Sequence, residues 1–366
     1  MPNPAPEGLF APAHSLLNLR HHSDAYVRLR TEWLTQVGDA RRMALDIAST
    51  SALAALGTLL RAQDYRFITV TPATHRRVNR RPENEWARDL RGVLGWSRPF
   101  REGVLPPDIE ALLDEAGLLE DCRSGQDHGR RALVRASTIG DRLYFHSAWP
   151  TSDDDAVFFG PDTYRYAAAM QRALASPLLG RARSDIRRAV DIGCGAGPGA
   201  IELALQCPQA TVYGADINPD ALALAAVNAG INGAAGLVPC RSNLLDGVDG
   251  SFDLAMSNPP FILDPDELPY RHGGGEHGAQ LSIDIVRTAL ERLNPGGSLL
   301  LYTGIAIVEG EDRFLGAIRA LLDEACSAWT YEELDPDIFG GQLGCDGYEN
   351  VERIAAVWLH AVKRGQ

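Results

Sequence analysis

The chain has 366 residues, of which 45% are hydrophobic and 23% charged, as is usual for a globular protein. At about 150 residues per domain, this length predicts two domains. The apolar stretches at residues 51–60 and 296–307 fall short of the roughly 20 apolar residues that cross a membrane, and residues 1–20 lack a secretory signal pattern. A cytoplasmic location without membrane association is therefore expected.

The net charge of −13 is unevenly distributed along the chain. Residues 1–150 hold 20 arginines against 18 acidic residues, whereas residues 151–366 hold 15 basic residues against 30 acidic ones. An acidic surface repels a polyanion, so non-specific binding of nucleic acid by the second part is disfavoured. Nine arginines between Arg66 and Arg101 are the exception. They are typical either of a solvated face or of a surface that contacts nucleic acid.

Neither cysteine nor histidine spacing indicates a metal site. The six cysteines are all more than four residues apart, which argues against a zinc knuckle or a redox pair. His272 and His277 lie in a glycine-rich stretch and could ligate a metal or act as bases, but loop histidines are more often simply solvated. No metal is expected.

Residues 1–150 read as a mostly helical accessory domain. Apolar residues recur at helical spacing in residues 24–37 and 41–60, and a short helix is expected at residues 109–116. Residues 131–138 and 141–149 are β-rich and flank a Gly140-Asp141 turn, which predicts a hairpin. Helices followed by a hairpin suggest a winged-helix-like domain that selects the substrate. Residues 151–156, with three successive aspartates, look like a linker.

From residue 157 to the end, strand-like and helical runs alternate. This pattern builds a parallel sheet with helices on both faces. The expected strands are residues 188–192, 210–216, 236–240, 252–256 and 297–303, and the expected helices are residues 199–206, 219–228, 282–293 and 312–324. Residues 328–332 and 351–362 read as an antiparallel hairpin. The fold class is therefore α/β, a Rossmann-like, seven-stranded, mostly parallel sheet with a C-terminal antiparallel hairpin.

The sharpest motif is a glycine-rich turn between the first expected strand and its helix. Asp191 and Ile192 lead into Gly193-Cys194-Gly195-Ala196-Gly197, and Asp216 ends the next expected strand. Glycines allow positive φ and a close approach of the backbone to a ligand. An aspartate at the end of the second strand can accept both ribose hydroxyls. Because Asp191 repels phosphate, the site suits a cationic ligand better than a dinucleotide.

This segment resembles motif I of class I S-adenosylmethionine-dependent methyltransferases, and the resemblance extends over about residues 157–362. It implies S-adenosyl-L-methionine as cofactor. The implied cofactor-binding residues are Asp191, Gly193, Cys194, Gly195, Gly197, Asp216, Ile217, Asn243, Leu244 and Asn258. Asn243 stands where an aspartate is common in the family, and an amide oxygen can still accept a hydrogen bond there.

Asn258-Pro259-Pro260-Phe261 follows the fourth expected strand and forms the candidate catalytic motif. Two successive prolines stiffen the turn and carry no N–H donor, so nearby carbonyls can face a ligand. The tetrad resembles the Asn-Pro-Pro-aromatic motif of methyltransferases that act on a nitrogen conjugated to a π-system. In this reading, Asn258 and the Pro259 carbonyl accept the two N–H groups of the acceptor, and Phe261 stacks on its plane.

Two flanking segments are weaker candidates. Phe158 to Tyr164 is similar to a segment of glutamine methyltransferases that covers the methionine end of the cofactor, although a simple domain junction explains it equally well. Thr163, Tyr164 and Phe261, with Arg271 in the glycine-rich stretch after the tetrad, are the candidate substrate contacts. That stretch could close over a substrate.

The resemblance is to the small-domain group that includes ribosomal-RNA guanine and release-factor glutamine N-methyltransferases. It implies an N-methyltransferase acting on a planar conjugated nitrogen, either a nucleobase amine or a protein glutamine amide. A methyltransferase of a small metabolite or natural product is the alternative, because the acidic body disfavours bulk RNA. An NAD-dependent oxidoreductase or a non-catalytic Rossmann-like module is a remote alternative, against which the glycine spacing, Asp191 and the tetrad argue.

Overall fold

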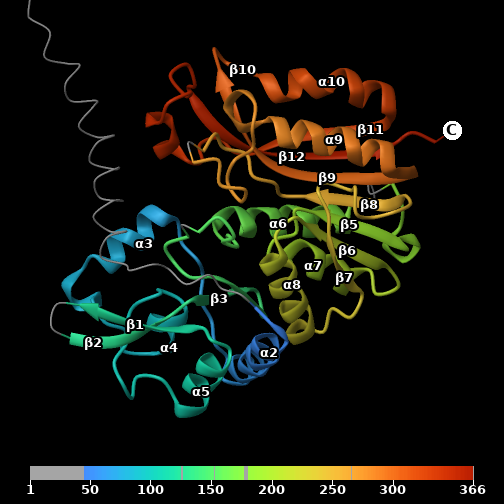
Figure 1. Ribbon diagram of the computed structural model, residues 1–366. Coiled ribbons are helices and arrows are strands. Elements are labelled where there is room, and N and C mark those ends of the chain that lie inside the picture. The colour runs from blue at the N-terminus through green and yellow to red at the C-terminus, as the bar shows by residue number, and fades with distance from the viewer. Residues whose placement is uncertain (1–44, 125–126, 152, 177–179, 265, 366) are drawn as a thin grey trace, which may run out of the picture.

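A large, mostly parallel sheet organises the C-terminal part of the chain (Figure 1). The computed structural model describes residues 45–365, apart from residues 125–126, 152, 177–179 and 265. The strand order is β11-β12-β9-β8-β5-β6-β7, with β10 paired to β9 outside this path. The strands are β5 (Arg188–Ile192), β6 (Thr211–Asp216), β7 (Leu237–Arg241), β8 (Phe252–Ser257), β9 (Leu293–Val308), β10 (Glu311–Asp312), β11 (Cys326–Asp335) and β12 (Arg353–Lys363).

Helices cover both faces of this sheet because buried strand residues alternate between its two sides. Ala189, Leu254 and Leu300 face the cluster that contains α6 and α7, whereas Val190, Ala255 and Leu299 face the cluster that contains α9 and α10. These helices are α6 (Pro161–Ala175), α7 (Pro198–Gln206), α8 (Pro219–Asn232), α9 (Gln280–Arg292) and α10 (Arg313–Ala325). Single-turn 3-10 helices lie at Arg183–Asp185 (η2), Glu276–Gly278 (η3) and Gly340–Gly344 (η4).

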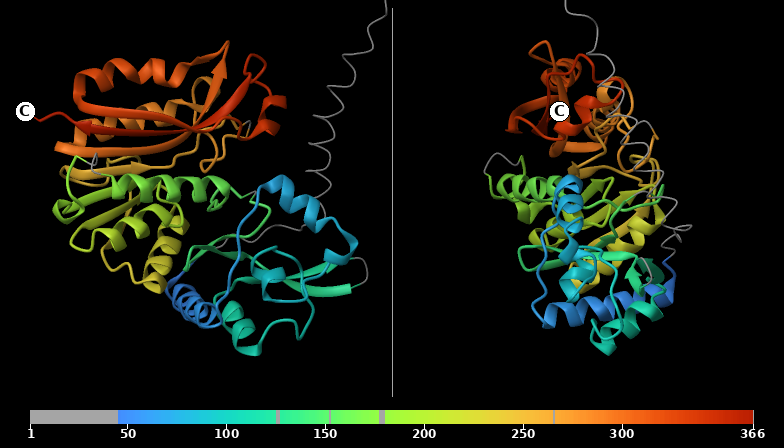
Figure 2. Two further views of the ribbon diagram at one scale, coloured as in Figure 1. Left: turned by 180° about the vertical axis from the view of Figure 1, so that it is seen from behind. Right: turned by 90° about the vertical axis from the view of Figure 1, so that its left-hand side faces the viewer.

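The N-terminal part consists of short helices and two separate hairpins, gathered beside α8 (Figures 1 and 2). Its elements are α2 (Ile47–Ala62), α3 (Pro72–Asn79), η1 (Pro82–Asn84), α4 (Leu90–Leu94), α5 (Pro107–Glu115), β1 (Leu119–Ser124), β2 (Asp127–Ala132), β3 (Val134–Ile139) and β4 (Arg142–Ser147). One cluster of buried apolar residues runs from α2 through β3 and β4 to Leu224 and Val227 of α8. The two parts of the chain therefore share a hydrophobic core.

Asn228 of α8 forms hydrogen bonds with the backbone of both parts. Its fully buried side chain accepts a hydrogen bond from the Phe145 N–H (2.8 Å) and donates to the Phe145 carbonyl (3.0 Å) in β4. The same amide nitrogen donates to the carbonyl of Ala196 (2.8 Å), in the glycine-rich turn. Asn232, one helical turn later, donates to the carbonyl of Leu143. One face of α8 thus replaces the missing strand partner of β4.

The expected α/β fold is confirmed, with differences of detail. The sheet has eight strands rather than seven, because the two residues of β10 add a short antiparallel pair to the end of β9. The hairpin across Gly140 is present as β3–β4, but the β1–β2 hairpin before it was not expected. The expected helix at residues 24–37 lies outside the described residues. No element tests the winged-helix or linker interpretation, which stays a prediction.

Candidate active site

Strand register brings the two sequence motifs together at the carboxyl edge of the sheet. Ile192 at the end of β5 pairs with Ser257 of β8 on one side and with Ala215 of β6 on the other. The Ser257 hydroxyl also donates to the Ile192 carbonyl (2.7 Å). Gly193, Asn258 and Asp216 therefore begin three neighbouring loops. This is where the strand order changes direction, the usual place for a ligand in an open α/β sheet.

The first glycine loop, residues 193–197, has the backbone that its sequence requires. Gly193, Gly195 and Gly197 have φ angles of +70°, +52° and +84°. A Cβ atom on Gly193 or Gly195 would meet nothing within 4 Å, whereas one on Gly197 would lie 3.1 Å from the Ala225 Cβ. The first two glycines thus border open space, and the third allows α7 and α8 to pack closely.

Asp216 is fixed beside this loop by backbone donors. Its carboxylate accepts hydrogen bonds from the N–H groups of Gly195 and Asn218, each at 2.9 Å. Burial raises the pKa of this carboxyl, and the backbone N–H groups oppose that rise. Ile217, the next residue, leaves 49% of its surface exposed, which is unusual for a large apolar side chain. A carboxylate and an apolar surface therefore stand side by side at the opening of the loop.

The segment after β7 lies along the same edge. Asp216 pairs with Arg241 in the sheet, and the Ser242 N–H donates to the Asp216 carbonyl (3.0 Å). Asn243 is exposed, and Leu244 adopts a positive φ of 48°. Asn243, the next residue after Ser242, therefore lies at this edge of the sheet, and its contact with a cofactor stays a prediction.

Asp191 and Cys194 lie beneath the first glycine loop. Asp191 is only 2% exposed, and its carboxylate accepts from the Tyr166 hydroxyl (3.1 Å) and the Ala200 N–H (2.9 Å). Burial raises the pKa of Asp191 to about 7, although both hydrogen bonds favour the ionised form. The Cys194 thiol packs against Gly214 and is likewise buried. Both side chains therefore support the loop from below.

The tetrad presents two acceptors that the protein itself leaves unused. Among the described residues, neither the Asn258 side chain nor the Pro259 carbonyl takes part in a hydrogen bond. Asn258 is half-buried, and Pro259 is buried. The Asn258 side chain is not among the buried polar groups that lack a partner, so its polar atoms are reached by solvent. Both acceptors are therefore free to take a hydrogen bond from an external donor.

The Phe261 side chain is buried, although a ring that stacks on a substrate needs one accessible face. Only 8% of its surface is exposed, and its ring stands edge-on to that of Phe339, with centroids 5.5 Å apart. A Cβ on Gly304 of β9 would lie 2.3 Å from the Phe261 ring. The ring is thus held in place by β9 and by the loop before η4. Its stacking on a substrate remains a prediction.

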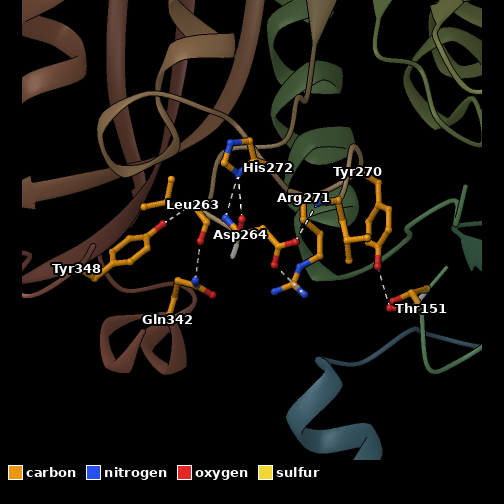
Figure 3. A network of polar contacts seen from close by, with 9 residues as sticks. Thr151, Leu263, Asp264, Tyr270, Arg271, His272, Gln342 and Tyr348 are labelled. Atoms are coloured by element: carbon orange, nitrogen blue, oxygen red, sulfur yellow. Dashed lines mark hydrogen bonds and ion pairs between the residues drawn. The ribbon is translucent and has the colours of Figure 1, made fainter. Parts of the chain in front are cut away.

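The segment after the tetrad forms hydrogen bonds with two other parts of the chain, the η4 region and the end of the N-terminal part (Figure 3). Leu263 accepts from the Gln342 side chain (3.0 Å) and donates its N–H to the Tyr348 hydroxyl (2.7 Å). The Tyr270 hydroxyl donates to the carbonyl of Thr151 (2.8 Å), where the N-terminal part ends. These contacts join the tetrad both to the η4 loop and to the accessory region.

Asp264 is the centre of this segment. The buried carboxylate accepts from the Leu268 N–H (3.1 Å) and lies 3.4 Å from the Arg271 guanidinium (Figure 3). His272 Nδ1 lies 3.2 Å from the backbone nitrogen and oxygen of Asp264. Arg271 is thus held against an internal carboxylate but remains one-third exposed. Its contact with a substrate stays a prediction.

The second glycine loop, residues 273–278, packs directly on the tetrad. A Cβ on Gly273 would lie 1.9 Å from the Gly278 carbonyl oxygen, and one on Gly278 would lie 2.6 Å from the Phe261 oxygen. His277 in this loop is buried, and its Nε2 lies 3.0 Å from the Asn350 Oδ1. The loop therefore supports the tetrad by close backbone packing.

The segment before α6 makes the contacts of a domain junction. The Thr163 hydroxyl accepts from the Gly160 N–H (3.2 Å) and caps α6, while the Tyr164 hydroxyl accepts from the Thr69 N–H (2.9 Å). These contacts leave the substrate role of both residues a prediction.

The residues that sequence reasoning missed are buried partners of the site. Asp162 accepts from the Tyr302 hydroxyl (2.7 Å) on β9, and Tyr166 donates to Asp191. The position of Asp162 inside the candidate segment Phe158 to Tyr164 was the available signal, because its partner is 140 positions away. Among the described residues, no helix is long and apolar enough to cross a membrane, and no three potential metal ligands gather.

Sequence comparison with known proteins identifies the family of this chain. Residues 172–306 match the family model of the methyltransferase small domain. The release factor glutamine methyltransferase of Deinococcus radiodurans is 36% identical over 237 residues, which cover 56% of this chain and 81% of that relative. The chain belongs to the small-domain methyltransferases. It is a class I enzyme, as its sequence motifs predict.

Other relatives of this methyltransferase match shorter segments. The ribosomal protein uL3 glutamine methyltransferase of Xanthomonas campestris is 31% identical over 182 residues, which cover 47% of this chain and 54% of the relative. Among solved structures, M. jannaschii TYW2 in complex with AdoMet aligns with a TM-score of 0.44 and 14% identity, over 67% of this chain and 90% of that one.

Proposed function

We propose that this methyltransferase uses S-adenosylmethionine to methylate the side-chain amide nitrogen of a glutamine in a protein of the translation machinery, in the cytoplasm. The pair of unused acceptors, Asn258 and the Pro259 carbonyl, beside the open first glycine loop carries the proposal. The names of the relatives, glutamine methyltransferases of release factors and of uL3, favour a protein amide over a nucleobase.

The residues at the carboxyl edge fit the proposed cofactor. Asp216 would accept the ribose hydroxyls, Ile217 would cover one face of the adenine, and Asn243 would meet its polar edge. The space beside Gly193 and Gly195 would receive the methionine part. The cofactor supplies an electrophilic methyl group on a sulfonium. The negative potential of Asp191 beneath the loop would favour that positive charge over the neutral thioether product.

The tetrad then prepares the acceptor nitrogen. An amide NH2 is planar, and its lone pair is delocalised into the carbonyl. When Asn258 Oδ1 and the Pro259 carbonyl each accept one N–H, they hold the nitrogen in one orientation, with its lone pair free to point at the methyl group. Orientation and exclusion of water account for most of the rate enhancement expected from such a site. As the new C–N bond forms and the sulfur–methyl bond breaks, the nitrogen would release one proton to water.

The accessory region would select the protein that carries the glutamine. It is joined to the post-tetrad segment through Thr151 and Tyr270, so a partner bound there lies in continuity with the acceptor corner.

The decisive experiment supplies methyl-labelled S-adenosylmethionine to the purified full chain, with isolated release factors, ribosomal proteins, RNA and small-molecule extracts in separate reactions. We expect label in a protein fraction, with one added methyl on a glutamine in peptide mass spectra. Label confined to RNA or to small molecules, lost with Asn258→Ala, would show a methyltransferase with another acceptor.

A further inference from the structure

The N-terminal part carries a group of arginines that the fold does not neutralise. Four arginines are all exposed: Arg77 in α3, Arg80 and Arg81 between α3 and η1, and Arg88 after η1. None forms an ion pair among the described residues, and Arg88 donates only to a backbone carbonyl, that of Glu83 (2.9 Å). We call these four residues the basic face. The acidic residues of the same stretch are Glu83, Glu85 and Asp89, and Asp89 is occupied in capping α4.

Some arginines of the catalytic part are paired with carboxylates: Arg165 contacts both Asp162 and Asp335, Arg313 pairs with Glu276, and Arg353 pairs with Glu333. Others, such as Arg172 and Arg187, are exposed and form no ion pair among the described residues, but no hollow with an aromatic ring is described beside them. Exposed charges more than about 10 Å apart are largely screened at physiological salt, so the negative net charge of the chain does not cancel the basic face.

Aromatic side chains accompany these arginines. A hollow of about 340 Å³ adjoins the basic face, and its lining includes Trp86, Arg88 and Arg101 together with two acidic residues, Glu83 and Glu85. The Arg101 guanidinium lies over the Trp86 ring at 4.6 Å, and Arg98 lies over Trp96 at 5.3 Å. Trp86 is half-buried and borders the hollow, whereas Trp96 packs against Phe67 and His75. An aromatic ring beside cationic groups can stack on a base while the cations bind the phosphates of a single strand.

We propose that the basic face binds single-stranded RNA, with phosphates on its arginines and a base in the hollow beside Trp86. An acidic protein would also pair with the arginines, but carboxylates would not stack on the Trp86 ring in the hollow. In Figure 1, α3 lies toward the left of the molecule, as do the loops that follow β8. The segment before α3 is also bonded to the first turn of α6, from the Thr69 N–H to the Tyr164 hydroxyl. An RNA-bearing particle held there would face the acceptor corner.

The test measures fluorescence anisotropy of a short, mixed-sequence single-stranded RNA with the full chain, from about 50 to about 200 mM salt. We expect Arg77→Glu/Arg81→Glu to bind at least about tenfold more weakly, with a slope of log Kd against log salt shallower by about 1.4, because each lost phosphate contact removes about 0.7. Arg77→Lys/Arg81→Lys should retain most binding, and Trp86→Ala should weaken it at least about fivefold.

A matched control separates local from global charge. Arg172→Glu/Arg187→Glu alters the net charge equally at two exposed arginines of the catalytic part and should leave the RNA affinity within about twofold. Thermal unfolding of each variant verifies folding. Equal weakening by both double variants, or no RNA binding at low salt, would overturn the proposal. The proposal would also be overturned if Arg77→Glu/Arg81→Glu changed turnover on a protein acceptor without RNA but left RNA binding unchanged. Binding is measured without methyl transfer, so its failure is distinct from failure of the proposed function.

Discussion

The two glycine loops of this enzyme have similar sequences and opposite environments. Residues 193–197 border open space, so that a methyl group on Gly193 or Gly195 would touch nothing. Residues 273–278 pack against the backbone of Phe261. Within this loop, a Cβ on Gly273 would lie 1.9 Å from the Gly278 carbonyl oxygen. Glycine leaves room for a ligand in the first loop and for the chain itself in the second. Glycine content alone therefore cannot distinguish a binding loop from a supporting one.

The largest effect is expected at the corner between the two loops. Asn258→Ala would remove one of the two acceptors proposed for the substrate nitrogen, without a substitution in either loop. We expect turnover to fall at least about 100-fold, about 2.7 kcal/mol of activation free energy, with unchanged cofactor affinity. Single-turnover kinetics and calorimetric titration of S-adenosylmethionine measure the two quantities. A loss of less than about threefold would remove the amide-clamp role.

The supporting loop is tested by stability. Gly273→Ala should lower the free energy of unfolding by about 3 kcal/mol, because the added methyl overlaps the Gly278 carbonyl. Gly274→Ala is the matched control in the same loop: its φ of +69° is strained for alanine, but the nearest atom would be 3.7 Å away. We expect it to cost about 1 kcal/mol. Equal denaturation midpoints for the two variants would contradict the packing role.

The binding loop is tested by affinity. Gly195→Ala should cost about 1 kcal/mol of stability through its positive φ, and should weaken S-adenosylmethionine binding at least about tenfold by filling the open space. Gly310→Ala, at a turn with φ of +76° and equal space around it, should show the same stability cost with no loss of affinity. Undiminished affinity in Gly195→Ala would mean that the space next to this residue holds no ligand.

The smallest expected effect is a pH dependence that distinguishes cofactor from product. Burial raises the pKa of Asp191 to about 7, so below that pH the carboxyl is largely protonated. A sulfonium favours the ionised form, so binding releases a proton, and affinity should rise with pH up to about 7 and level off above it. S-adenosylhomocysteine, which lacks the charge, should show a weaker rise. Titrations from pH 5.5 to 8 in parallel with Asp191→Asn, which should abolish the difference, provide the measurement.

Sequence alone predicted the catalytic fold well because buried parallel strands and their helices have distinct patterns. Sequence alone predicted fewer of the elements of the N-terminal part. The β1–β2 hairpin was missed because Leu119–Ser124 and Asp127–Ala132 are rich in charged residues and lack the apolar alternation of a half-buried strand. At the site, the positions of Gly193, Asp216 and Asn258 follow from strand order, since each lies at or directly after the end of a neighbouring strand. Asp162 and Tyr166 do not, because their partners are set by packing between distant segments.

The bonding of Asn228 has a consequence for how the two halves communicate. Its amide is anchored to the backbone of β4 and to the carbonyl of Ala196 within the first glycine loop. A displacement of the hairpin by a bound partner must either strain this joint or carry the loop with it. By thermodynamic reciprocity, whatever a docked partner does to the affinity for the methyl donor, the donor does equally to the affinity for that partner. A single buried amide would thus connect a partner bound at the hairpin with the proposed cofactor site.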